Sequence, residues 1–338
     1  MESTMKKYAE RIARNEVDPH FLDDGRTSGL LLDPRREDVP LDLLGFGIFR
    51  LGQDAVIFET GDSELVLVPQ EGEFEVEAGG KHFAGSRAGG PFSPGPGRSN
   101  ASAVYVPRGV KMEIRGNGEV AFFSAPALGD KPPFHLPPDK VQVVSRGDWI
   151  WRRDIVSLVS PKDATTNLIV GETYSPPGYW SGTPLHSHDR EDPAAGESDH
   201  EEIYYHRFSW KKGGDDLFGP YGVQMLMDGE RLQKAYPITD RSVFAIPGGC
   251  HPVVASPVSA LLYLWGLAGR SGELRMRDIP EFAHLKTFER IFQELAGDRS
   301  VRILSKKKFR GLCAAHALTA EQAGLLAEML REKGYEFE

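Results

Sequence analysis

The chain has 338 residues and a formal net charge of −9, and its 37 glycines and 24 prolines are spread along the sequence. This acidic balance gives no electrostatic support for binding the phosphate backbone of nucleic acids. There is no apolar run long enough to cross a bilayer, no apolar signal-peptide core near the start, and no cysteine framework, since only 2 cysteines occur. The composition therefore predicts a folded, turn-rich, cytoplasmic protein that leans toward β structure and binds neither nucleic acid nor membrane.

Residues 1–24 are expected to form an N-terminal helical segment. Met5, Tyr8 and Ile12 recur at helical spacing within a charged stretch, which is typical of an amphipathic helix that packs on a larger body.

Residues 25–130 are expected to form a first β region. From about residue 40 to 127 apolar and polar residues alternate with period two, as in half-buried strands. The pattern predicts a strand over 65–68, a turn at 70–72, a second strand over 73–77 and a hairpin turn at Gly79-Gly80. Many short strands separated by Gly and Pro turns predict an antiparallel barrel or sandwich.

A proline-rich joint at 131–138 precedes a second region of the same character, at 139–275. The run VYVP at 104–107 is similar to FAIP at 244–247, and each is followed by a glycine two residues later. We therefore expect one strand–turn–strand unit to have been used twice, giving two barrels on a duplicated plan.

Residues 280–338 are expected to form a helical appendage. Apolar residues from Phe282 to Leu295 follow a helical stripe, and Thr319 with Gln322 forms a capping box before another apolar run. The basic run at 306–310 is short and local, so we interpret it as a solvated face.

Histidines and carboxylates in the second region follow an order that suits a metal site. His186 and His188 form a His-x-His pair, and alternate residues of a strand face the same side, so both imidazoles can reach one ion. Glu201 and Glu202 then open a β run, and His251 follows a Pro-Gly-Gly turn. Three neutral imidazoles and one carboxylate suit one borderline divalent cation, with Zn or Mn expected first and Fe, Co or Ni as alternatives.

This order is similar to that of the two cupin motifs. More narrowly, four runs resemble the 5-deoxy-glucuronate isomerase family of myo-inositol catabolism: GETYSPPGYWS at 171–181, PLHSHD at 184–189, EEIYYHRF at 201–208 and PGGCHPV at 247–253. FETGDSEL at 58–65 is similar to the amino-terminal barrel of that family, and the resemblance covers roughly residues 25–270.

The resemblance implies an all-β bicupin, with two tandem double-stranded β-helix barrels and the helical segment added after them. It implies a metal-dependent aldose–ketose isomerase that converts 5-deoxy-glucuronate to 2-deoxy-5-keto-gluconate through an enediolate. The ligands would be His186, His188, Glu202 and His251, and Glu202 is preferred over Glu201 because it directly precedes the apolar run. The first barrel has no His-x-His pair, so it would lack a metal and have a structural role. A small sugar acid and further copies of the chain are the expected partners.

The catalytic groups are predicted from strand alternation. If Glu202 points inward, Tyr204 and His206 turn the same way. The isomerisation needs a base near neutral pKa, and His206 is the most suitable by type, with Glu201 or a metal-bound hydroxide as alternatives. Tyr204 would orient a sugar hydroxyl or pack as a core aromatic.

Other roles stay open at this point. Trp180 would wall the site or pack in the core, and Lys234 or Arg207 would bind the substrate carboxylate. The competing functions are an isomerase of another uronate or modified sugar, a non-haem metal cupin dioxygenase, and a cupin that binds a sugar acid without converting it.

Overall fold

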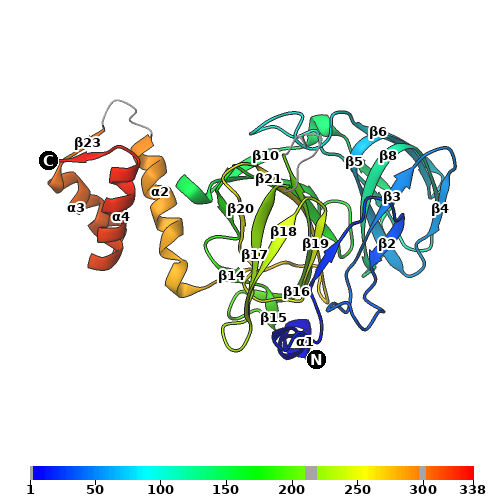
Figure 1. Cartoon of the computed structure of the whole chain (residues 1–338), viewed down its shortest axis with the longest axis horizontal. Coiled ribbons are helices and arrows are strands. Elements are labelled where there is room, and N and C mark those ends of the chain that lie inside the picture. The colour runs from blue at the N-terminus through cyan, green and yellow to red at the C-terminus, as the bar shows by residue number, and fades with distance from the viewer. Residues whose placement is uncertain (1–2, 210–218, 297–301) are drawn as a thin grey trace.

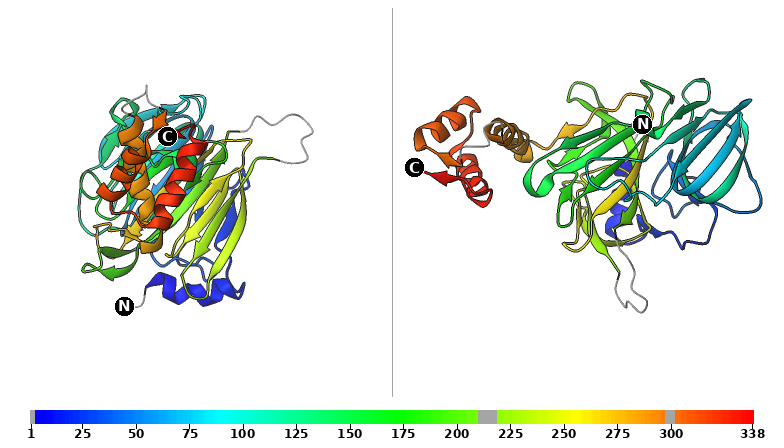
Figure 2. Two further views of the ribbon diagram at one scale, coloured as in Figure 1. Left: turned by 90° about the vertical axis from the view of Figure 1, so that its left-hand side faces the viewer. Right: turned by 90° about the horizontal axis from the view of Figure 1, so that it is seen from above.

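The structure is a computed structural model that describes residues 3–209, 219–296 and 302–338. Two β bodies lie side by side, and a group of helices stands on the side of the second body that faces away from the first (Figure 1, Figure 2). The chain therefore runs through three successive parts, two of strands and one of helices.

The first body is an antiparallel barrel built from one long sheet. Its strand order is β2 (Gly29–Leu32), β3 (Gly45–Leu51), β8 (Lys111–Pro126), β5 (Ser63–Ala78), β7 (Ala103–Val106) and β9 (Phe134–Leu136), while β4 (Val56–Glu59) pairs with β8 and β6 (Lys81–Arg87) pairs with β5.

One strand of this barrel is longer than the sequence pattern predicted. The turn expected at 70–72 is wrong, because β5 continues through it with a register shift between Pro69 and Glu71. An extra residue in one strand bends it without ending the ladder, so a bulge reads locally like a turn. The hairpin turn at Gly79 and Gly80 is confirmed, with φ values of +57° and +72° between β5 and β6.

The second body consists of facing sheets. The larger has the order β1 (His20–Leu22), β19 (Ser242–Ile246), β16 (Glu197–Phe208), β21 (Leu261–Gly269), β12 (Ile169–Ser175), β11 (Arg153–Val159) and β10 (Val143–Arg146), with β15 (Asp189–Asp192) paired to β16. The smaller has the order β13 (Trp180–Ser181), β20 (Val253–Ala255), β17 (Tyr221–Met227) and β18 (Gln233–Thr239), and β14 (His186–Ser187) pairs with β22 (Arg277–Asp278).

The apolar face of the N-terminal helix packs on the second body. Helix α1 (Thr4–Ala13) is confirmed, and its predicted apolar face of Met5, Tyr8 and Ile12 is buried in the second body's core. The β1 strand then pairs with β19, which leads to the His251 turn.

The two barrels share one apolar core between them. Period-two alternation gives β5 and β16 two different faces, and Val66 and Ile203 face this shared core. The neighbouring Leu65 instead belongs to the interior of the first barrel. The shared core also includes Phe46, Phe123, Val156, Leu158, Tyr205 and Leu264.

Two buried glutamates join the barrels reciprocally. Glu64 of the first barrel accepts backbone N–H groups of Thr166, Asn167 and Leu168 at 2.7–2.8 Å. Glu201 of the second barrel accepts the backbone N–H groups of residues 42–44 at 2.8–3.0 Å. Each carboxylate therefore satisfies a loop of the opposite barrel, which would otherwise bury unpaired donors.

Replacing Glu64 by glutamine should lower the free energy of unfolding by about 2 kcal/mol, because the new amide group turns N–H donors toward backbone N–H donors. Urea denaturation followed by circular dichroism measures this. Glu59→Gln on exposed β4 is the matched control, and equal midpoints for the two variants would show that Glu64 does not hold the barrels together.

The duplicated plan is visible in the strand register. Leu65 of β5 pairs with Val106 of β7, as Glu202 of β16 pairs with Ile246 of β19. At equivalent positions the first barrel therefore has a leucine where the second has a carboxylate. Lys111 follows Val106 at the same interval as His251 follows Ile246, so Lys111 occupies the position of His251 in the first barrel. At these two positions the first barrel therefore has neither the carboxylate nor the imidazole of the second.

The appendage consists of α2 (His284–Ala296), α3 (Lys306–Ala315) and α4 (Ala320–Glu332), with the short strands β23 (Ile303–Leu304) and β24 (Glu336–Phe337). The predicted stripe is buried on α2 from Phe288 to Leu295, whereas Phe282 precedes the helix and is exposed. The Thr319 capping box is present on α4, and the basic run on α3 is largely exposed. The helices pack on Trp151 in the 3-10 turn η2 (Trp149–Trp151) of the second body. Within the described part of the chain, no helix has the length and apolar character needed to span a membrane.

Candidate metal centre and active site

The second barrel brings two chain segments together around Glu202. His188 lies just before β15, and its carbonyl accepts the backbone N–H of His200 at 2.8 Å. His251 follows a tight turn in which Gly248 and Gly249 have φ values of +144° and +75°. A Cβ on Gly248 would lie 2.3 Å from the Cβ of Asp189, so only glycine fits there.

Asp189 connects the segment that carries His188 to the turn before His251. Its Oδ2 accepts the backbone N–H of Gly249 at 2.8 Å. The residue after His188 thereby holds the turn that carries His251, which fixes the distance between the two imidazoles.

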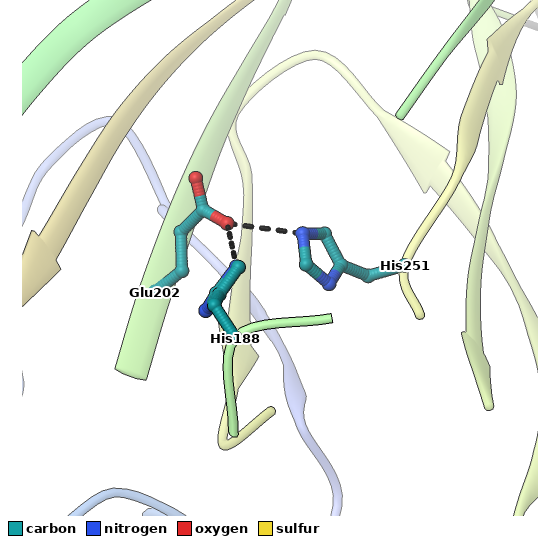
Figure 3. A group of neighbouring side chains, drawn as sticks. All are labelled: His188, Glu202 and His251. Atoms are coloured by element: carbon teal, nitrogen blue, oxygen red, sulfur yellow. Dashed lines mark ion pairs between the residues drawn. The ribbon is translucent and has the colours of Figure 1, made fainter. Parts of the chain in front are cut away.

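His188, Glu202 and His251 form a compact buried group (Figure 3). Glu202 Oε2 lies 3.3 Å from His188 Nε2 and 3.0 Å from His251 Nε2, and the three donor atoms all lie within 4.8 Å of one another. His186 stands beside this group and not within it, with ring-centroid distances of 5.8 Å to His251 and 6.4 Å to His188. The structure thus brings three of the four predicted ligands together and places the fourth next to them.

A hydrogen bond from Nδ1 to the backbone orients each of the three imidazole rings. The Nδ1 atoms of His186, His188 and His251 lie 3.0, 3.0 and 2.7 Å from the backbone carbonyls of Pro184, His200 and Gly249. A carbonyl can only accept, so each ring donates from Nδ1, and Nε2 is the nitrogen that remains to bind a metal. The Nε2 atom of His251 is buried and makes no aligned hydrogen bond, despite its short distance to Glu202.

The charges also suit a cation. Burial alone would raise the pKa of Glu202, but its contacts with His188 and His251 lower that pKa to about 2. Burial lowers the pKa of His186 to about 4, so this ring is neutral near pH 7. The group therefore offers imidazole nitrogens and one anionic oxygen, a donor set that fits a borderline divalent ion.

The barrel interior next to this group has a polar aromatic wall. The rings of Tyr204 and Tyr263 lie 4.4 Å apart, and the Tyr204 ring lies 5.7 Å from that of His251. Ser181 Oγ is hydrogen-bonded to the Tyr263 hydroxyl at 2.5 Å. Burial raises the pKa of both tyrosines, so both hydroxyls keep their protons.

Comparison with known proteins decides the relationship. The KduI/IolB family matches residues 21–285, which is most of the chain. The chain belongs to the KduI/IolB family. The match ends within α2, so most of the helical appendage of this family member lies beyond it.

Relatives of this family member include two proteins named 5-deoxy-glucuronate isomerase. The one from Geobacillus kaustophilus is 30% identical over 239 residues, covering 69% of this chain and 82% of that protein. The one from Listeria monocytogenes is 27% identical over 247 residues, covering 71% and 86%.

Solved structures agree on the fold. The crystal structure of an IolB-like protein from Salmonella typhimurium matches with a TM-score of 0.70 and 24% identity, covering 79% of this chain and 99% of that chain. An oxalate decarboxylase of Bacillus subtilis matches with a TM-score of 0.51 and 10% identity, covering 78% and 80%. The predicted fold, two tandem cupin barrels with an added helical segment, is confirmed.

The interpretation of Glu201 as a base is wrong for this family member. Both of its carboxylate oxygens accept hydrogen bonds from residues 42–44 and Thr4, on the face of β16 that points away from Glu202. Successive residues of a strand face opposite sides, so only one of the two adjacent glutamates can enter the barrel.

His206 points inward, as predicted, but its ring is held by residues of other strands. It has no exposed surface, and its ring nitrogens lie 3.1 Å from the Ser242 carbonyl and 3.3 Å from Gln224 Oε1. Burial lowers the pKa of His206 to about 4. Because Gln224 in turn donates to the His251 carbonyl at 2.8 Å, His206 supports the His251 turn and is not placed to take a substrate proton.

The cations expected to bind a carboxylate also serve other contacts. Lys234 bonds to the Ile12 carbonyl and Asn15 at the end of α1, and Arg207 pairs with Asp240 at 3.0 Å on the outer face of β16. Trp180 packs against the appendage, so the core-packing alternative holds for it.

Sequence reasoning missed Tyr263 and Arg153, which both face the barrel interior. The signal for Tyr263 was the pairing of β16 with β21, where Tyr263 is opposite His206. The alternation along one strand does not show which strand pairs with it, so the sequence pattern could not place Tyr263 beside His206.

Proposed function

We propose that this protein is a metal-dependent aldose–ketose isomerase that converts 5-deoxy-glucuronate to 2-deoxy-5-keto-gluconate in inositol catabolism. The observation that carries the proposal is the buried His188–Glu202–His251 group with its inward-facing Nε2 atoms, in a chain whose relatives are named for this isomerase. The proposal is strengthened by the tyrosine wall beside that group.

The residues that would hold the metal are His186, His188, Glu202 and His251. A Zn or Mn ion, or alternatively Fe, Co or Ni, would supply Lewis-acid polarisation of the substrate carbonyl when bound there. The second barrel alone offers this donor set among the described residues, because Leu65 and Lys111 occupy the equivalent places in the first.

The protein's own groups then orient the substrate. Tyr204 and Tyr263 keep their phenolic protons, so they donate hydrogen bonds to sugar oxygens beside the metal ligands. Because the site is enclosed by the barrel, these bonds form in a medium of low polarity and hold the sugar in one pose.

Incubation of the protein with 5-deoxy-glucuronate in D2O, followed by NMR, tests the proposal. We expect the ketose to accumulate and deuterium to enter at the carbon that gains a proton. Formation of product without added oxidant distinguishes the isomerase from a dioxygenase, which would consume O2. Binding without conversion would favour a sugar-acid sensor. If only another uronate is converted, the protein is an isomerase with a substrate other than 5-deoxy-glucuronate.

A further inference from the structure

Arg153 is the first residue of β11, and its side chain belongs to the inner face of the second barrel. On β11, Val156 and Leu158 pack in the apolar core between the two barrels, so residues of the other parity face inward. Ile155, which shares the face of Arg153, pairs with Thr173. Thr173 pairs in turn with Tyr263 on β21, so Arg153 lies at one end of the interior wall that contains the two tyrosines.

The Arg153 guanidinium has unused hydrogen-bonding capacity. Its one hydrogen bond within the described residues is from Nη1 to the Trp151 carbonyl at 3.3 Å, and no described carboxylate is within ion-pair distance. Other enclosed arginines differ: Arg87 pairs with Glu172, Arg207 with Asp240, and both Arg50 and Arg241 with Asp23. A guanidinium has five donors, so four donors of Arg153 have no hydrogen-bond acceptor among the described residues.

The charge of Arg153 reaches the tyrosine wall. It acts to lower the pKa values of Tyr204 and Tyr263, whereas the charge of Glu202 acts to raise them, although burial is the largest influence on both. The two hydroxyls are therefore within electrostatic range of both the guanidinium and the metal-ligand group. Glu289 of α2 also acts on Arg153, but its Oε1 is held by the backbone N–H of Gly147 at 2.9 Å.

We propose that Arg153 binds the carboxylate of the sugar-acid substrate, while the metal ligands mark the end at which the carbonyl reacts. A guanidinium recognises a carboxylate through two parallel N–H···O bonds, which fixes direction as well as affinity. A uronate has its aldehyde and its carboxylate at opposite ends of a six-carbon chain. A site with a metal group at one end and an unpaired guanidinium at the other admits such a substrate in one orientation. This inference rests on the proposed function, since it assigns one end of the same substrate.

The position of Arg153 depends on the appendage. The preceding turn, η2, packs through Trp151 on the helices that follow the second barrel. The Trp151 carbonyl also accepts the hydrogen bond from Arg153. The helices thus support the turn that aims this side chain.

The test compares 5-deoxy-glucuronate with its neutral analogue 5-deoxy-glucose, in which a hydroxymethyl group replaces the carboxylate. For Arg153→Met we expect the KM for the acid to rise about 10- to 100-fold, while kcat/KM for the neutral analogue changes little. Arg153→Lys should recover part of the preference for the acid, because it restores the charge but not the two-pronged geometry. Arg152→Met, which removes a half-buried arginine that pairs with Asp154 at 3.1 Å, is the matched control.

Calorimetric binding of the same two sugars separates this inference from the proposed function, because it does not require turnover. If the protein binds the acid without converting it, the isomerase proposal fails, and loss of acid binding in Arg153→Met still supports the assignment. Equal losses for acid and neutral sugar, or unchanged discrimination between them, would overturn it. Metal content is measured in each variant, and a drop in Arg153→Met would also count against a role confined to the carboxylate.

Discussion

Replacing His251 by alanine should abolish stoichiometric metal binding and reduce isomerase activity by about three orders of magnitude. Lewis-acid catalysis by a bound ion contributes several kcal/mol, and each 1.36 kcal/mol is worth about a factor of ten in rate. His251 contributes a buried Nε2 that has no other aligned partner, so its loss removes a donor that no neighbour replaces. Elemental analysis of the purified variant and the NMR assay measure the two effects.

The same substitution should destabilise the metal-free protein. Glu202 is only 5% exposed, and two imidazoles lie against its Oε2. Removing one leaves a buried carboxylate with poorer compensation. His82→Ala is the matched control, because His82 is exposed on β6 of the first barrel. Full metal occupancy in His251→Ala, or an equal loss in His82→Ala, would contradict the ligand assignment.

Replacing Arg87 by alanine should lower the free energy of unfolding by about 3–5 kcal/mol. Arg87 on β6 of the first barrel forms a two-pronged salt bridge with Glu172 on β12 of the second, at 2.5 and 2.8 Å. Both residues are buried, with exposed fractions of 1% and 2%. The substitution leaves the Glu172 charge between the barrels without its partner, which costs more than the intact pair contributes.

Denaturant unfolding monitored by fluorescence measures this loss. Arg108→Ala, which breaks an exposed pair with Asp130 of similar length, should leave the midpoint unchanged. The double variant Arg87→Met with Glu172→Leu should recover most of the stability, because it removes both charges together. A single variant as stable as Arg108→Ala would show that the barrels do not depend on this pair.

Much of the site was predictable because its signals are local. The His-x-His pair, the adjacent Glu201 and Glu202 and the glycine turn before His251 each depend on one short segment, and their order along the chain carries the cupin pattern. The strand with the glutamates begins earlier than predicted, at Glu197, so they lie in the middle of β16. The alternation along β16 correctly predicted that Tyr204 and His206 point inward with Glu202.

The predictions that failed concern residues whose hydrogen-bond partners lie far away in the sequence. His206 is suitable by type, but its contacts with Ser242 and Gln224 come from other strands. Glu201 differs from Glu202 in sequence only by one position, yet it serves the opposite barrel through backbone donors at 42–44. No property of residue 201 alone reveals those donors, which lie more than 150 positions away in the chain.

Periodicity, turn chemistry and spacing act over a few residues, so they were enough to predict most strands, the helices at both ends, the duplicated barrel plan and the order of the metal-ligand candidates. The packed fold was needed to show that His206 is held by other strands and that Arg153 has no carboxylate partner among the described residues. It was also needed to show that Glu201 faces the opposite barrel. Those outcomes depend on strand register and on contacts between the barrels, where burial makes every unpaired charge or donor costly. Arg153, which we propose as the cation for the substrate carboxylate in place of Lys234 or Arg207, is distinguished from the other enclosed arginines by the carboxylate partner that it lacks among the described residues.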